Sequence, residues 1–232
     1  MNTQSSNYKV HFINDSNFSN YVDFPGYLID KYRAGKITKT HLSDILRFNL
    51  LEKHGGLWFD STILVTQPLQ NYTQYWSLPY FTRKVCLDKN IFHPFIMRTS
   101  HSPATFVTFA RWTGFFQSTS IKNNPLFTFG KNFFENYWRD FDELIEYFLI
   151  DLVIDIAYDN ISFVKQEIDA VPINNTELGS LVYHLNDLYK DYPFDNLYED
   201  TFLYKLTYRD IGYLDMQNSD TVFRQIQRRY ET

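Results

Sequence analysis

The chain has 232 residues, of which 44% are hydrophobic and 21% are charged. This length and composition fit one globular domain with a buried core, and they exclude a disordered protein and two complete catalytic domains. The net charge of −5 argues against a nucleic-acid partner, because proteins that bind nucleic acid usually carry a basic surface.

The N-terminal region is predicted to contain one strand and one short helix. Residues 1–7 are polar and expected to be disordered, and the Val, Phe and Ile content of residues 8–15 favours a strand. Residues 27–35 are typical of a short helix, with Gly35 at its expected C-terminus.

An amphipathic helix is predicted from residue 39 onward. Apolar residues recur along it at the three- and four-residue spacing of one buried face, at Leu42, Ile45, Leu46 and Leu50. The adjacent glycines Gly55 and Gly56 are expected to end this helix. Two short apolar runs follow, at 57–59 and 63–65, and both are typical of buried strands.

The remainder of the chain alternates between expected helices and strands, without an internal repeat. We expect helices over 103–119, 141–158 and 180–189, strands over 90–100 and 201–209, and an amphipathic tail over 221–232. This mixture predicts an α/β sandwich in a single domain spanning residues 1–232.

Asp44 and Arg47 are three residues apart on the predicted helix, so they lie on one face of it. A carboxylate accepts hydrogen bonds from sugar hydroxyls, and a guanidinium binds hydroxyls or phosphate in a forked geometry. The two side chains are therefore suited to one ligand. An i, i+3 ion pair on the protein surface is the alternative interpretation.

Asp60 lies between the two short apolar runs, at an expected strand end. Mg²⁺ and Mn²⁺ take few carboxylate ligands together with phosphate oxygens. Asp60 is therefore a candidate ligand for a metal that holds a diphosphate. An aspartate that only stabilises a turn or caps a helix is the alternative interpretation.

The segment SDILRFNLLEKHGGLWFDST, residues 43–62, combines an SD-x-x-R pair, a Gly-Gly pair and W-x-D-x-T in close order. It resembles the helix, Gly-Gly and acidic strand-end block of the capsular polysaccharide synthesis protein family, which is related to DXD-containing, mannosyltransferase-like glycosyltransferases. The similarity extends to residues 8–38, to IEYFLIDLVIDIAY and to TFLYKLTYR. Most of the chain is covered.

This resemblance implies a Rossmann-like type A glycosyltransferase sandwich. It implies that Asp44 and Arg47 contact the donor sugar and that Asp60 serves catalysis, the metal and the diphosphate. The donor-binding residues that it implies are Ser43, Asp44, Arg47, Gly55, Gly56, Trp58 and Thr62.

The sequence departs from the wider pattern at two places. Where relatives have Asp-x-Asp, this chain has Asp60-Ser61-Thr62, so the second acid is replaced by a hydroxyl. Members normally begin with a strand of the Pro-Lys-Ile-Ile-Trp kind, whereas Met1 lies only a few residues before the segment that resembles the second strand. We therefore expect the first strand of the nucleotide pocket to be lacking.

Asp151 and Asp155 are one turn apart within an apolar predicted helix. Both are candidates to face the site as a base or a sugar contact, and Asp151 is the candidate catalytic residue. The alternative is a polar stripe on that helix, or pairing with a nearby cation.

The cysteine content and the apolar runs indicate a compartment for the chain. Cys86 is the single cysteine, which excludes an intramolecular disulfide and suits a reducing compartment. No run approaches the roughly 18 to 20 apolar residues of a membrane span, so a cytoplasmic location is expected. The tail carries Arg224, Arg228 and Arg229 and suits peripheral contact with the inner membrane face, or a solvated terminal helix.

The sequence therefore predicts a glycosyltransferase dependent on Mn²⁺ or Mg²⁺. It would move a sugar from a nucleotide diphosphate donor to a glycan or lipid-linked acceptor in capsular or exopolysaccharide synthesis. A truncated, inactive remnant or binding component of a polysaccharide assembly system is the alternative. The chain has no HExxH, GxSxG or GxxxxGK[ST] motif, which argues against zinc hydrolases, serine hydrolases and P-loop ATPases.

Overall fold

A computed structural model describes residues 8–85, 111–207 and 214–230. The described part has α/β architecture. Its α-helices are α1 (Gly26–Arg33), α2 (Lys39–His54), α3 (Thr73–Trp76), α6 (Pro125–Asp140), α7 (Leu149–Asn160), α8 (Ser162–Ala170) and α9 (Val222–Tyr230). Its 3-10 helices are η1 (Phe18–Asn20), η2 (Leu69–Tyr72) and η3 (Leu181–Tyr183).

The strands form two small antiparallel sheets. They are β1 (Gly56–Phe59), β2 (Ile63–Val65), β3 (Phe81–Thr82), β4 (Phe116–Thr119) and β5 (Leu203–Lys205). One sheet has the order β1-β4-β3, and the other pairs β2 with β5. These sheets confirm the α/β class, while the larger Rossmann-like sandwich stays a prediction.

Helix α2 begins and ends at the residues that its sequence indicates. The Thr38 side chain accepts a hydrogen bond from the backbone N–H of His41 at the N-terminus. Gly55 ends the helix with a φ of 69°, a conformation that favours glycine. The apolar stripe is buried as expected, and the opposite face is buried as well, including Asp44 and Arg47.

Close packing of α2 against α6 depends on Gly130. A Cβ atom placed on Gly130 would lie 2.3 Å from the ring of Phe48, which is fully buried on α2. The absence of a side chain at Gly130 therefore lets the two helices approach. Phe48 also packs against Phe127 and Phe134 of α6.

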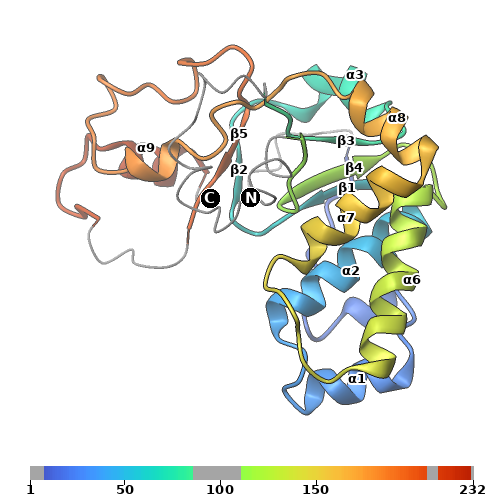
Figure 1. Ribbon diagram of the computed structural model, residues 1–232. Coiled ribbons are helices and arrows are strands. Elements are labelled where there is room, and N and C mark those ends of the chain that lie inside the picture. The colour runs from blue at the N-terminus through green and yellow to red at the C-terminus, as the bar shows by residue number, and fades with distance from the viewer. Residues whose placement is uncertain (1–7, 86–110, 208–213, 231–232) are drawn as a thin grey trace.

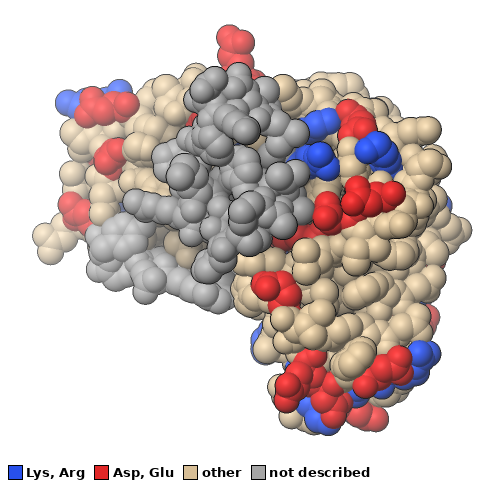
Figure 2. Space-filling model, in the orientation of Figure 1, with Lys and Arg blue, Asp and Glu red and all other residues tan. Residues whose placement is uncertain are grey.

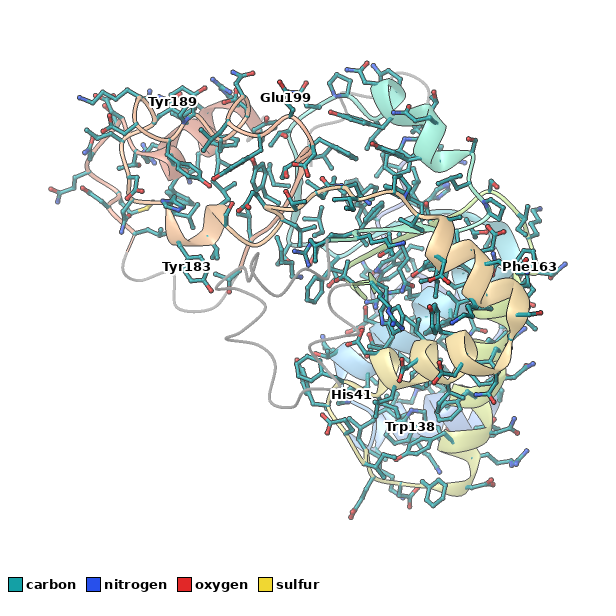
Figure 3. All side chains as sticks on the ribbon, turned by 45° about the horizontal axis from the view of Figure 1, so that its top comes forward. His41, Trp138, Phe163, Tyr183, Tyr189 and Glu199 are labelled. Atoms are coloured by element: carbon teal, nitrogen blue, oxygen red, sulfur yellow. The ribbon has the colours of Figure 1, made fainter. Side chains whose placement is uncertain are left out.

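The hydrophobic core consists of a large cluster and a separate C-terminal cluster. The large cluster includes residues of α1, α2, α6, α7, α8 and the three-stranded sheet. The C-terminal cluster is formed by buried side chains at Leu181, Leu185, Tyr192, Phe194, Tyr204, Leu214, Val222 and Ile226. Figure 3 shows the two regions apart, with Trp138 among the helices and Tyr183 and Tyr189 in the C-terminal part.

The β2–β5 pair connects these two clusters, and it lies between α9 and the three-stranded sheet in Figure 1. Successive side chains of a strand point to opposite faces. Leu203 accordingly packs in the large cluster and Tyr204 in the C-terminal cluster. The same alternation places Lys205 on the face of Leu203, toward the main body of the protein.

The C-terminal segment is a packed helix rather than a solvated tail. Val222 and Ile226 of α9 are buried in the C-terminal cluster. Arg229 forms an ion pair with Asp195 and donates a hydrogen bond to the Tyr189 hydroxyl. Part of the apolar face that suits a membrane surface is therefore covered by the chain itself, and peripheral membrane contact stays a prediction.

Several predicted elements differ from the observed ones. Residues 8–15 form no strand, because no described strand pairs with them and Val10 and Phe12 are exposed. A helix was expected over residues 103–119, but residues 116–119 form strand β4, which pairs with β1 and β3. Tertiary pairing overrides local helical preference there. The expected strand over 90–100 lies outside the described residues.

The helices of the second half were also predicted incompletely. Residues 141–148 are not helical, so α7 begins eight residues later than expected. The expected helix over 180–189 is reduced to η3, since turns follow it. Helices α6 and α8 were not predicted, and the predicted 201–209 strand is confirmed at β5.

Charged side chains of both signs gather at the lower end of the molecule (Figure 2), where Figure 1 shows helix α1. Lys31 of α1 and the nearby Lys36 form ion pairs with Asp142. The Asp142 carboxylate is half exposed, so these pairs are solvated and contribute little to stability.

Within the described ranges, no helix has the length and apolar character needed to cross a membrane.

The α2–α6 contact predicts a stability difference between two glycine substitutions. We expect Gly130→Ala to lower the free energy of unfolding by about 1–3 kcal/mol, because the new methyl group overlaps the buried Phe48 ring. Gly26→Ala at the start of α1 is the control, since the described residues place no atom beyond its chain neighbours and its own helix within 4 Å of the added Cβ. Urea unfolding of both variants tests this, and equal stabilities would contradict it.

Candidate functional site

A single cleft with a volume of about 1460 Å³ contains all of the predicted site residues. Helix α2, strand β1, the turn after β1, the start of α7 and strand β5 all contribute to its walls. The predicted residues that line it are Ser43, Asp44, Arg47, Gly55, Gly56, Trp58, Asp60, Thr62 and Asp151. Segments far apart in the sequence therefore converge on one cavity, while the roles of these residues stay predictions.

Arg47 is the central cation of the cleft. Its Nη1 lies 3.3 Å from Asp44 Oδ1, and its Nη2 lies 3.1 Å from Asp60 Oδ1. The guanidinium also lies over the Trp58 ring, 5.2 Å from its centroid. Asp44 and Arg47 are only 8% and 3% exposed, so the interpretation of a surface ion pair is wrong.

Gly114 makes room for this guanidinium. A Cβ atom on Gly114 would lie 2.8 Å from Arg47 Nη1 and 3.4 Å from Ile150 of α7. Arg47 has little freedom to move away, because its two terminal nitrogens are already paired with carboxylates. A side chain at Gly114 would therefore displace the guanidinium or Ile150.

Asp60 lies in the turn that connects β1 to β2. Its backbone N–H donates to the carbonyl of Phe115, and its carbonyl accepts from the N–H of Ile63. Its Oδ1 accepts hydrogen bonds from Arg47 and from Trp58 Nε1, the latter at 3.0 Å. The carboxylate is therefore held in the cleft by side-chain donors and does not cap a helix.

Lys205 is a site residue that the sequence reasoning missed. Its Nζ lies 3.1 Å from Asp60 Oδ2 and donates a hydrogen bond to the Thr62 hydroxyl. The ammonium also lies 4.5 Å from the centroid of the Phe115 ring. The available signal was one lysine inside a predicted apolar strand, TFLYKLTYR, but nothing local connects it to Asp60.

Asp151 lies in the first turn of α7 and is nearly completely buried. Its Oδ1 has no hydrogen-bond partner among the described residues. Burial, reinforced by the nearby Asp44 carboxylate, raises the pKa of Asp151 to about 7. Arg47 and the nearby Trp112 indole oppose this rise, although Trp112 Nε1 makes no hydrogen bond of normal geometry to any described residue.

Asp44 is perturbed in the same direction. Burial raises its pKa to about 7, the ion pair with Arg47 opposes the rise, and the negative charge of Asp60 adds to it. Burial therefore raises the pKa of both Asp44 and Asp151 toward neutral pH. A carboxyl group whose pKa lies near neutral pH is suited to accept or donate a proton in a reaction.

The side chains around Asp60 do not fit a divalent cation well. Asp60 is the one predicted metal ligand, and its two oxygens already accept from Arg47, Trp58 and Lys205. Thr62 offers a neutral hydroxyl instead of a second carboxylate. Within residues 8–85, 111–207 and 214–230, no group of three or more His, Cys, Asp or Glu side chains is arranged to hold a metal ion.

Comparison with known protein families gives a match. The profile of the family described as capsular polysaccharide synthesis protein matches residues 1–226. No curated protein and no solved structure matches the chain. The family match covers nearly all of the sequence, including every residue that lines the cleft.

The buried Asp151 predicts a pH-dependent gain of stability in the variant Asp151→Asn. The pKa of Asp151 is higher in the folded chain than in the unfolded chain, so folding binds a proton between about pH 4 and pH 7. The ionised group therefore destabilises the fold increasingly as the pH rises through this window. The neutral amide of the variant removes this cost.

We expect Asp151→Asn to unfold at higher urea concentration than the parent at pH 8, by about 2–4 kcal/mol in unfolding free energy. The gain should shrink toward pH 4, where the unfolded chain is protonated as well. A gain that is independent of pH, or a loss of stability at pH 8, would contradict the assignment of a raised pKa.

Proposed function

The chain belongs to the capsular polysaccharide synthesis protein family, and on this premise we propose that it is a glycosyltransferase. It moves a sugar from a nucleotide diphosphate donor to a glycan or lipid-linked acceptor during synthesis of the capsule. One observation carries this proposal. A single cleft brings the paired Asp44, Arg47 and Asp60 together with Asp151, whose buried Oδ1 has no hydrogen-bond partner in the part of the chain that the structure describes.

The α2 side of the cleft is suited to the donor sugar. Carboxylate oxygens of Asp44 accept hydrogen bonds from sugar hydroxyls, and Arg47 binds hydroxyl or phosphate oxygens with fixed N–H directions. The partly exposed Trp58 ring beside Arg47 offers an apolar surface for one face of a sugar ring. These groups are held in place before the donor binds, which reduces the entropy lost on binding.

Asp151 is suited to receive a proton from the acceptor. In the transfer, the bond from the anomeric carbon to the β-phosphate oxygen breaks, and its electron pair stays on that oxygen. The acceptor hydroxyl oxygen bonds to the anomeric carbon, and its proton passes to the Asp151 carboxylate. A pKa of about 7 leaves a substantial fraction of Asp151 ionised and ready to act as the base near neutral pH.

Transfer and donor hydrolysis assays with a panel of uridine- and guanosine-diphosphate sugars test this proposal. We expect Asp151→Asn to lower kcat by about 100-fold or more, because the amide cannot accept the proton. Asp155→Asn is the matched control, since Asp155 lies one turn further along α7 and outside the cleft lining. We expect its kcat to stay within about threefold of the parent value.

Two outcomes would contradict the proposal. Equal losses in the two aspartate variants would remove Asp151 from the reaction. Absence of turnover with every donor, with and without Mn²⁺, would favour a non-catalytic binding component of a polysaccharide assembly system.

A further inference from the structure

The ammonium group of Lys205 lies between the two ends of Asp60-Ser61-Thr62. It forms an ion pair with Asp60 Oδ2 at 3.1 Å and donates a hydrogen bond to the Thr62 hydroxyl. These are the first and third side chains of the motif, between which a divalent cation would be bound if both were carboxylates. The Lys205 ammonium thus already occupies the position between Asp60 and Thr62 where the cation would lie.

The fold aims Lys205 at this position through backbone pairing. In the β2–β5 ladder, Lys205 lies opposite Ile63, and Ile63 is the residue that follows Thr62 in the sequence. The N–H of Leu206 donates to the carbonyl of Thr62, which fixes the two chains on either side of the lysine. The Lys205 side chain is only 17% exposed and lines the cleft, so it is directed into the cavity rather than toward bulk solvent.

Asp60 is flanked by two cations, with Arg47 at Oδ1 and Lys205 at Oδ2. Asp44 pairs with the other terminal nitrogen of Arg47, so the two cations and two carboxylates are neutral together when both acids are ionised. N–H groups nevertheless remain for another anion. Arg47 Nε has no hydrogen-bond partner among the described residues, and Asp60 and Thr62 accept from only two of the three N–H groups of Lys205. A diphosphate is an anion that Lys and Arg side chains commonly bind.

We propose that Lys205 replaces the divalent cation in this cleft, so that Lys205 and Arg47 bind the donor diphosphate without a metal. This inference rests on the proposed glycosyltransferase function and deepens it. It also accounts for Thr62. A second carboxylate there would complete a metal site, whereas a hydroxyl accepts a hydrogen bond from the ammonium and adds no negative charge beside the diphosphate.

The chemical part of Lys205 in the transfer is electrostatic. As the bond from the anomeric carbon to the β-phosphate oxygen breaks, negative charge grows on the leaving diphosphate. The ammonium stabilises that charge and keeps its own protons, so no proton transfer from Lys205 is needed. The acceptor proton passes to Asp151 as described above.

Isothermal titration calorimetry with UDP and GDP, in EDTA and in Mn²⁺, tests the inference on the full chain. We expect at least one nucleotide to bind in EDTA with a Kd within about threefold of its value in Mn²⁺. In EDTA, Lys205→Met should weaken that binding by about 10-fold or more, as expected for loss of a hydrogen bond to a charged group. Lys205→Arg keeps the charge and should retain more affinity than Lys205→Met.

The control is Lys190→Met, which removes an exposed lysine outside the cleft and should leave the Kd unchanged. Binding by the parent chain only in Mn²⁺ would overturn the inference and leave the glycosyltransferase proposal standing, whether or not the lysine variants fold. Unchanged affinity in folded Lys205→Met would also overturn it. Absence of nucleotide binding in both buffers would overturn the inference together with the proposed function.

Discussion

Burial of the Arg47 guanidinium is the constraint on which the cleft depends. A buried cation is costly unless carboxylates and hydrogen bonds compensate for lost hydration, and removing one partner of such a pair is strongly destabilising. Arg47 obtains its partners from its own helix, through Asp44, and from the turn after β1, through Asp60. The position of the β1–β2 turn relative to α2 is thereby fixed, and the cleft lies where the two meet.

The rest of the structure supports this ion network from three directions. Strand β4 pairs with β1 and holds Asp60 through the Phe115 carbonyl, while Gly114 leaves space for the guanidinium. Strand β5 brings Lys205 from the C-terminal part of the chain, where a separate hydrophobic cluster stabilises it. Helix α7 brings Asp151 into the lining of the same cleft. The C-terminal part is thus a contributor to the site and not an appendage.

The sequence predicted those parts of the structure that depend on neighbouring residues, and it failed for parts that depend on residues far away in the sequence. The helix over α2, its end at Gly55 and the strand end at Asp60 are determined by neighbouring residues, and their positions were predicted correctly. Strand β4 was predicted as helix, because its conformation depends on partners more than 30 residues away. Lys205 was missed for the same reason, since 145 residues separate it from Asp60. Spacing also indicated that Asp44 and Arg47 share a face, but not that this face is buried.

The central claim is that the network around Asp60 binds the donor diphosphate through side-chain cations. A crystal structure of the chain grown with UDP-glucose or GDP-mannose in EDTA tests it most directly. The account predicts diphosphate oxygens within hydrogen-bond distance of Lys205 Nζ and the Arg47 guanidinium, with the sugar beside Asp44 and facing Asp151. A diphosphate bound away from Lys205 and Arg47, or a structure in which the donor binds only when Mn²⁺ bridges it to Asp60, would contradict the claim.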